Sequence, residues 1–202
     1  TNTYESLVFF SGAVAAVAGI LALALRRRLG EFVLFGATMV ALVLLMLSSS
    51  PLAPRDIQPP IPALRSLWLV LHVTLSFIGE AFFAVSFVAA IVALASRDGE
   101  RRDQADRLVA ATIGIGYPVF TAGALIFGAI WAETAWGTYW SWDPKETWAL
   151  VTWLIYTAYL HTRLVRRLRG RTSAILAIVG FAATIFTFLG VNFLLPGLHS
   201  YG

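Results

Sequence analysis

The sequence predicts an all-α, polytopic membrane protein of about six transmembrane helices with both termini outside, on the periplasmic or lumenal side. Of its 202 residues, 58% are hydrophobic and only 13% are charged, whereas an ordinary soluble domain has roughly 25% charged and 45–50% apolar residues. A soluble globule of this size buries only part of its surface, so it could not hide so many apolar side chains. The sequence has no cysteine, which excludes a disulfide scaffold and thiol redox chemistry on this chain.

Each predicted helix is an apolar stretch of about 20 residues, the length that crosses a bilayer of about 30 Å. The six stretches are 5–25, 31–49, 67–95, 108–131, 146–165 and 173–195. Pro118 predicts a kink in the fourth helix, because proline removes a backbone hydrogen bond. The glycines of this helix, Gly114, Gly116, Gly123 and Gly128, predict close packing against neighbouring helices. Short inner loops and the lack of a repeat predict one membrane domain, 1–202.

Arginines set the orientation of the helices. Twelve of the 15 basic residues lie in the three connections on one side, and only Arg55, Arg65 and Lys145 lie on the other side. Loops rich in Lys and Arg stay on the inner side of the membrane. The net charge of +4 therefore indicates helix orientation within a lipid bilayer, and we expect no nucleic-acid partner.

The outer segment 131–147 is rich in tryptophan. An aromatic belt at the membrane surface accounts for one or two tryptophans. Here four of them precede the fifth helix: Trp131, Trp136, Trp140 and Trp142. A large, flat, apolar ring system fits such a surface, because aromatic faces stack on it while a basic side chain meets its peripheral carboxylates.

The next four residues, Asp143-Pro144-Lys145-Glu146, predict the start of the fifth helix. An Asp at the N-cap, a Pro at the first helical position and a Glu at the third form a capping-box pattern. Such a cap would hold the tryptophan-rich segment against the helix.

The run WAETAWGTYWSWDPKETWALVTWLIYTAYLHTR resembles the WWD-domain signature of haem-handling membrane proteins. Its part WSWDPKETWAL is similar to the CcsA (ResC) type of System II cytochrome c biogenesis. The resemblance extends from about Leu64 to Tyr201, while residues 1–60 match only as apolar helices. It implies transport of haem b and its presentation to apocytochrome c for thioether attachment at CXXCH, as a subunit of a holocytochrome c synthase. No catalytic side chain is expected on this chain.

The chain has three histidines, and an intramembrane ionisable residue is often functional. The resemblance implies that His72 and His199 are the outer haem ligands. It implies that His161, about 20 Å down the fifth helix from Trp148, ligates an inner haem together with a histidine of a CcsB (ResB) protein. The alternative for His161 is a structural polar residue that reaches toward the interface near Arg163.

Other polar residues leave alternatives open. The basic candidates for haem propionates are Lys145, Arg65 and Arg55, and Asp143 joins the four tryptophans as a candidate cofactor contact. Glu80, within the third helix, is protonated, paired with an inner arginine, or part of the haem path.

Two other classes of function compete with the synthase. The first is a haem exporter or chaperone without ligation activity, as in the CcmC type, which shares the tryptophans but continues differently after the Asp. The second is a proton-coupled transporter using Glu80 and His161. We expect the bacterial inner membrane, with the plastid thylakoid as the alternative, and separate thiol reductants that keep the apocytochrome reduced.

Overall fold

The computed structural model describes residues 2–24, 27–51, 53, 64–165, 169–195 and 197–198. Within these residues the regular structure is helical throughout. Its elements are α1 (Thr3–Ala24), α2 (Arg27–Ser48), α3 (Leu67–Ala95), α4 (Gly99–Phe120), the π-helix η2 (Thr121–Phe127), α5 (Gly128–Trp136), α6 (Pro144–Leu164), α7 (Arg171–Ile185), the π-helix η4 (Phe186–Gly190) and α8 (Val191–Leu194). The predicted all-α fold is confirmed.

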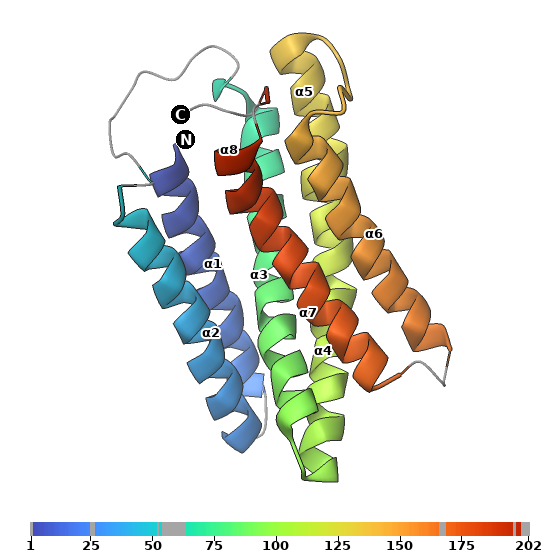
Figure 1. The fold of residues 1–202 in the computed structure, drawn as a ribbon. Helices are drawn as coiled ribbons and strands as arrows, with labels where there is room; N and C mark the ends of the chain where they lie inside the picture. Colours follow the sequence, from blue (N-terminus) through green and yellow to red (C-terminus); the bar gives the residue numbers. More distant parts are fainter. Residues whose placement is uncertain are drawn as a thin grey trace.

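The helices run up and down in one bundle (Figure 1). α4, η2 and α5 follow one another without a break, as do α7, η4 and α8, so the described chain forms six helical rods. The start of α1, the end of α8 and the α5–α6 connection lie at the same end of the bundle (Figure 1), which we call the outer end because the sequence predicts that it faces outward. The α3–α4 connection, the end of α6 and the start of α7 lie at the opposite end, which we call the inner end.

Five helices of the described residues are long and apolar enough to cross a membrane. α6 is not one of the five, although it has 21 residues. It carries several Thr and Tyr residues besides His161 and Arg163 near its end, and these lower its hydropathy. The multi-pass membrane protein predicted from composition is nevertheless confirmed, since the other rods span by length and composition.

The fourth rod begins earlier than predicted. It starts at Gly99 rather than at residue 108, because Asp98 is an N-cap whose side chain accepts a hydrogen bond from the Glu100 backbone N–H at 3.0 Å. The segment predicted as an inner loop therefore forms the first turns of α4. Arg101 lies on these turns, with its guanidinium carbon 5.2 Å from the ring centroid of Phe32 on α2.

The core surrounds α3, which packs against α1, α2, α4, η2, α5 and α7. Small side chains let the backbones approach closely. A Cβ added at Gly116 would lie 3.0 Å from the Gly79 carbonyl oxygen, and one at Gly123 would lie 2.7 Å from the Leu75 carbonyl carbon. The predicted close packing is thus confirmed at Gly116 and Gly123. It is wrong at Gly114, where an added Cβ would meet nothing within 4 Å.

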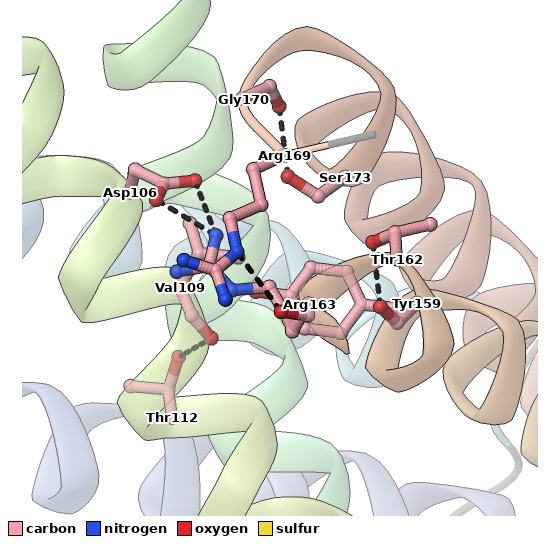
Figure 2. A network of polar contacts seen from close by, with 9 residues as sticks. All are labelled: Asp106, Val109, Thr112, Tyr159, Thr162, Arg163, Arg169, Gly170 and Ser173. Carbon is pink, nitrogen blue, oxygen red and sulfur yellow. Dashed lines mark hydrogen bonds and ion pairs between the residues drawn. The ribbon is translucent and has the colours of Figure 1, made fainter. Parts of the chain in front are cut away.

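A polar network fixes the inner end of α6 (Figure 2). One guanidinium nitrogen of Arg163 lies 2.9 and 2.7 Å from the two carboxylate oxygens of Asp106 on α4. Arg169 Nε donates to the Arg163 carbonyl oxygen at 2.9 Å, which satisfies an acceptor at the C-terminus of the helix. The end of α6 that carries His161 is therefore held to α4 by side-chain contacts.

Candidate functional site

Two π-helical turns interrupt the long rods near the outer end of the bundle. η2 begins three residues after Pro118, whose missing N–H interrupts the regular hydrogen-bond ladder. η4 occupies the equivalent place in the last rod. Single π-turns are frequent at functional sites, and residues of both turns line one cavity, which indicates where to look for a ligand.

The cavity has a volume of about 180 Å³. Its walls come from α1, α3, α4, η2, α5, the α5–α6 loop, α6, η4 and α8, so it collects residues that lie far apart in the sequence. Most of the wall is apolar or aromatic. The side chains that carry chemistry on this wall include His72, Glu80, Trp131, Trp140, Lys145, Glu146 and Asn192. The structure therefore brings together four of the residues proposed as cofactor contacts.

His72 is held on two sides. Its Nδ1 lies 2.9 Å from the carbonyl oxygen of Gly123 in η2, and because a carbonyl only accepts, Nδ1 is the donor. The ring stacks on the indole of Trp131, with centroids 5.8 Å apart and planes only 8° from parallel. Trp131 is buried, and the indole of Trp136 meets it edge-on at 4.9 Å. These two tryptophans thus support the imidazole.

Lys145 and Glu80 bring two ionisable groups to the same cavity. Lys145 Nζ donates to Asn192 Oδ1 at 2.8 Å, which directs the ammonium group toward α8. Glu80 is buried, and its Oε2 has no hydrogen-bond partner among the described residues. The structure places Glu80 on the cavity wall. A buried carboxylate oxygen without a partner costs free energy unless a ligand, a water molecule or a proton satisfies it.

The α5–α6 connection is shorter than the predicted outer loop. α5 ends at Trp136, where Gly137 takes the left-handed conformation (φ +79°) that stops a helix. Trp131 and Trp136 therefore lie on a helix. Trp142 also has positive φ (+59°), a strained conformation for a bulky residue. Its side chain is 68% exposed and meets Trp140 edge-on at 5.7 Å, so the strained turn displays an indole rather than burying it.

Asp143 acts as the predicted N-cap. Its Oδ2 accepts from the Lys145 backbone N–H at 3.0 Å, and Glu146 Oε2 accepts from the Asp143 N–H at 3.3 Å, so the capping box is confirmed. The other carboxylate oxygen accepts from the backbone N–H of Leu198. Asp143 therefore joins the start of α6 to the chain that follows α8, and it does not line the cavity.

The remaining predicted residues lie elsewhere. His161 is exposed near the inner end of α6. Arg65 is exposed and is not part of the cavity wall. His199 and Arg55 lie outside the described residues.

Several residues on the cavity wall were not predicted. Asn2, Thr3 and Ser6 reach it from the start of α1, and Asn192 reaches it from α8. An Asn within an apolar stretch is a signal that could have indicated Asn192. The Gly123 carbonyl leaves no such signal, because a backbone acceptor has no side-chain identity.

The cavity can be tested against the haem that the sequence motif implies. An imidazole, indole faces and an ammonium group match the iron, the ring and the propionates of haem, respectively. The volume of about 180 Å³ is below the 300–1,000 Å³ of typical ligand pockets. The residues therefore fit haem, provided that part of the ring lies outside the cavity, where the exposed Trp142 is available.

The fold and the cavity define a class: a multi-pass membrane protein with a histidine held among tryptophans at its outer end. The family model described as "Cytochrome C assembly protein" matches residues 1–199. The chain is 37% identical to the "Cytochrome c biogenesis protein CcsA" of Guillardia theta and 36% identical to that of Gloeobacter violaceus. These alignments cover all of this chain and 76% and 78% of the two relatives. The protein of that name from Chlamydomonas reinhardtii is 44% identical, over 74% of this chain and 45% of the relative.

The chain belongs to the cytochrome c assembly family and, within it, to the CcsA type of System II cytochrome c biogenesis. Its role is in cytochrome c maturation, a process that handles haem in a membrane. The match also corrects the extent of the resemblance, because it includes the first 60 residues, which the motifs alone did not assign. Asn2, Thr3 and Ser6 on the cavity wall give this segment a structural role at the site.

Proposed function

We propose that this chain carries haem b across the membrane and presents it at the outer cavity to apocytochrome c, as a subunit of a System II cytochrome c synthase. The observation that carries the proposal is the single cavity wall on which His72, Trp131, Trp140 and Lys145 come together. They supply an iron ligand backed by the indole of Trp131, an aromatic face from Trp140 and a cation for a propionate. The family membership adds that the acceptor is a cytochrome c.

At the outer site, His72 and His199 would hold the haem iron. His199 follows directly after Leu198 in the chain, and the Leu198 N–H is bonded to Asp143. Asp143 thereby acts on the cofactor through the chain rather than by contact. Lys145 is the first candidate for a propionate because it lines the cavity, whereas the exposed Arg65 does not.

The reaction needs no acid or base from this chain. The haem supplies two vinyl groups, and each CXXCH thiol adds across one of them: sulfur bonds to one vinyl carbon and the hydrogen goes to the other. The addition causes no net oxidation or reduction, so the thiols must arrive reduced, which requires separate thiol reductants. The CXXCH histidine then replaces one outer histidine on the iron. This chain orients the ring and ligates its metal.

The inner site needs a second protein. Arg163 faces α4 through its ion pair with Asp106, and two residues of α-helix correspond to a rotation of about 200°. His161 therefore points away from α4, in agreement with its exposure. A histidine on the outer surface of the bundle is suited to share an iron with a histidine of a CcsB (ResB) partner.

The site of action is the bacterial inner membrane or, as the alternative, the plastid thylakoid. The alternative function is a CcmC-like haem exporter or chaperone, which would bind haem without completing the thioether bonds. The two functions differ only in the covalent product.

The test has two parts. The protein is purified from cells that make haem, with and without its CcsB-type partner, and its absorption spectrum is recorded. A Soret band is expected, with altered ligation in His72→Ala and loss of only the inner haem in His161→Ala. Leu164→Ala is the matched control for His161, because Leu164 is also exposed on α6. A protein without a Soret band in both preparations would contradict haem handling.

The second part separates synthase from exporter. The pair is co-expressed with a CXXCH apocytochrome, and haem that survives denaturing electrophoresis is measured. Covalent haem that depends on this chain supports the synthase. Bound but never covalent haem would favour the exporter.

A further inference from the structure

The π-helical turn η2 and the residue that follows it hold the ring of His72 in one orientation. The ring contacts two elements that meet at Gly128, which is the first residue of α5. One contact is the hydrogen bond from Nδ1 to the Gly123 carbonyl, and the other is the stack on Trp131. The stack fixes the plane of the ring, and the hydrogen bond fixes which edge faces η2.

The hydrogen bond also selects the tautomer. A neutral imidazole has one N–H and one nitrogen with a lone pair. Because the Gly123 carbonyl can only accept, the proton lies on Nδ1 and the lone pair lies on Nε2. The two ring nitrogens point in divergent directions, so the lone pair of Nε2 points away from η2. A histidine that ligates a metal through one nitrogen is oriented by a hydrogen bond at the other nitrogen.

The π-turn provides the acceptor. The Gly128 N–H donates to the Gly123 carbonyl across five residues, the spacing that defines a π-helix. The same oxygen receives Nδ1 of His72 at 2.9 Å. A carbonyl oxygen has two lone pairs, so it serves both donors. Gly123 therefore closes the turn and holds the imidazole with one atom.

Gly128 leaves the space that the imidazole occupies. A Cβ at this position would lie 3.0 Å from Nδ1 and 3.1 Å from Cε1 of His72. These distances are shorter than ordinary van der Waals contact, so a methyl group would push the ring away from the Gly123 carbonyl. A Cβ at Gly123 would instead meet the α3 backbone at Leu75 and Ser76, so replacing Gly123 disturbs helix packing as well.

We propose that Gly128 and the Gly123 carbonyl form a positioning device that presents Nε2 of His72 as the iron ligand. This inference rests on the proposed function, because it requires haem at the outer cavity. Gly128 lines the same cavity, but the nearest atoms to an added Cβ are those of the His72 ring, so in this scheme it acts through that ring.

The main variant is Gly128→Ala, with Gly114→Ala as the matched control. Gly114 lies in the same rod, and an added Cβ there meets nothing within 4 Å. Haem is titrated into the purified protein while absorption and electron paramagnetic resonance spectra are recorded. Gly128→Ala is expected to weaken haem affinity about 10- to 100-fold, the range for loss of a group that orients a ligand. Its spectrum should lose low-spin character, and added imidazole should restore it.

A double-variant comparison separates positioning from general damage. Haem binding by His72→Ala is measured with imidazole supplied in solution, with and without Gly128→Ala. Because the device acts only through His72, Gly128→Ala should then have no further effect. A further loss of the same size would overturn the inference. If Gly128→Ala alone matches the wild type while His72→Ala alters the spectrum, the device is wrong but the outer site stands. If His72→Ala itself changes nothing, both the outer site and the device are wrong.

A further measurement uses the haem-free wild-type protein, so it does not depend on whether a glycine variant folds. The protein is labelled with ¹⁵N-histidine, and the His72 signals are assigned by their loss in His72→Ala. The proton is expected on Nδ1. A proton on Nε2 would overturn the proposed orientation.

Discussion

Asp143→Ala should destabilise the protein more than loss of an ordinary helix cap. In the structure the Asp143 carboxylate accepts two backbone N–H groups, from Lys145 at the start of α6 and from Leu198 after α8. Removing an N-cap costs about 0.5–2 kcal/mol. A hydrogen bond to a charged group contributes about 1.5–3 kcal/mol. The expected loss is therefore about 2–5 kcal/mol.

The chain offers a matched control for this prediction. Asp98 is the N-cap of α4 and accepts from the Glu100 N–H at 3.0 Å, as Asp143 does from the Lys145 N–H. Asp98 is exposed, and a cap is its only role that the structure shows. Asp98→Ala should therefore cost only about 0.5–2 kcal/mol. The difference between the two variants measures what Asp143 contributes beyond capping, which includes the bond to Leu198.

The assay is equilibrium unfolding in mixed detergent micelles, followed by circular dichroism, with the free energy of unfolding compared among the three proteins. Limited proteolysis adds a local measurement, because release of residues 197–198 should speed cleavage after α8 in Asp143→Ala alone. Equal destabilisation by Asp143→Ala and Asp98→Ala, with unchanged proteolysis, would refute the argument that Asp143 holds this segment.

Two further predictions concern packing and charge. Gly180→Ala should lower the free energy of unfolding by about 1–3 kcal/mol, because its Cβ would lie 2.7 Å from the ring of the buried Tyr156. The control is Gly19→Ala, which has open space around it and should be neutral or stabilising. Asp106→Ala should cost about 1–3 kcal/mol, between a surface and a buried ion pair, since its side chain and that of Arg163 are 24% and 23% exposed. The control is Asp103→Ala, because Asp103 is exposed on the same helix. An equal loss of unfolding free energy in both variants would contradict a specific ion pair between Asp106 and Arg163.

The sequence predicts the rods because the bilayer makes few alternatives possible. A segment without water must satisfy its backbone internally, so long apolar runs become helices. The arginines then determine which ends share a side. The start of α6 was equally readable, since Asp143, Pro144 and Glu146 each have a known place in a capping box. The rods and the start of α6 are determined by residues that are close together in the sequence, so the sequence alone predicts them.

The cavity depends on contacts that sequence spacing does not specify. Neither η2 nor η4 was predicted, because a π-turn has a weak sequence signature and is stabilised by its surroundings. His72 and Glu80 were recognised as unusual residues within an apolar helix, but the structure was needed to place Lys145 and Asn192 beside them. Nδ1 of His72 contacts the backbone oxygen of Gly123. Every residue carries such an oxygen, so the residue type does not predict this contact.

One helix connects the two proposed haem sites and shows why they differ. Lys145, at the outer end of α6, lines the cavity. His161 lies 16 residues further along the same uninterrupted helix, which corresponds to about four turns plus 160°. The two side chains therefore point to nearly opposite faces. In the proposed scheme this chain encloses the outer site with its own helices, whereas it offers His161 alone to the inner site, and a second protein supplies the other ligand. The separate loss of inner haem expected in His161→Ala follows from this arrangement.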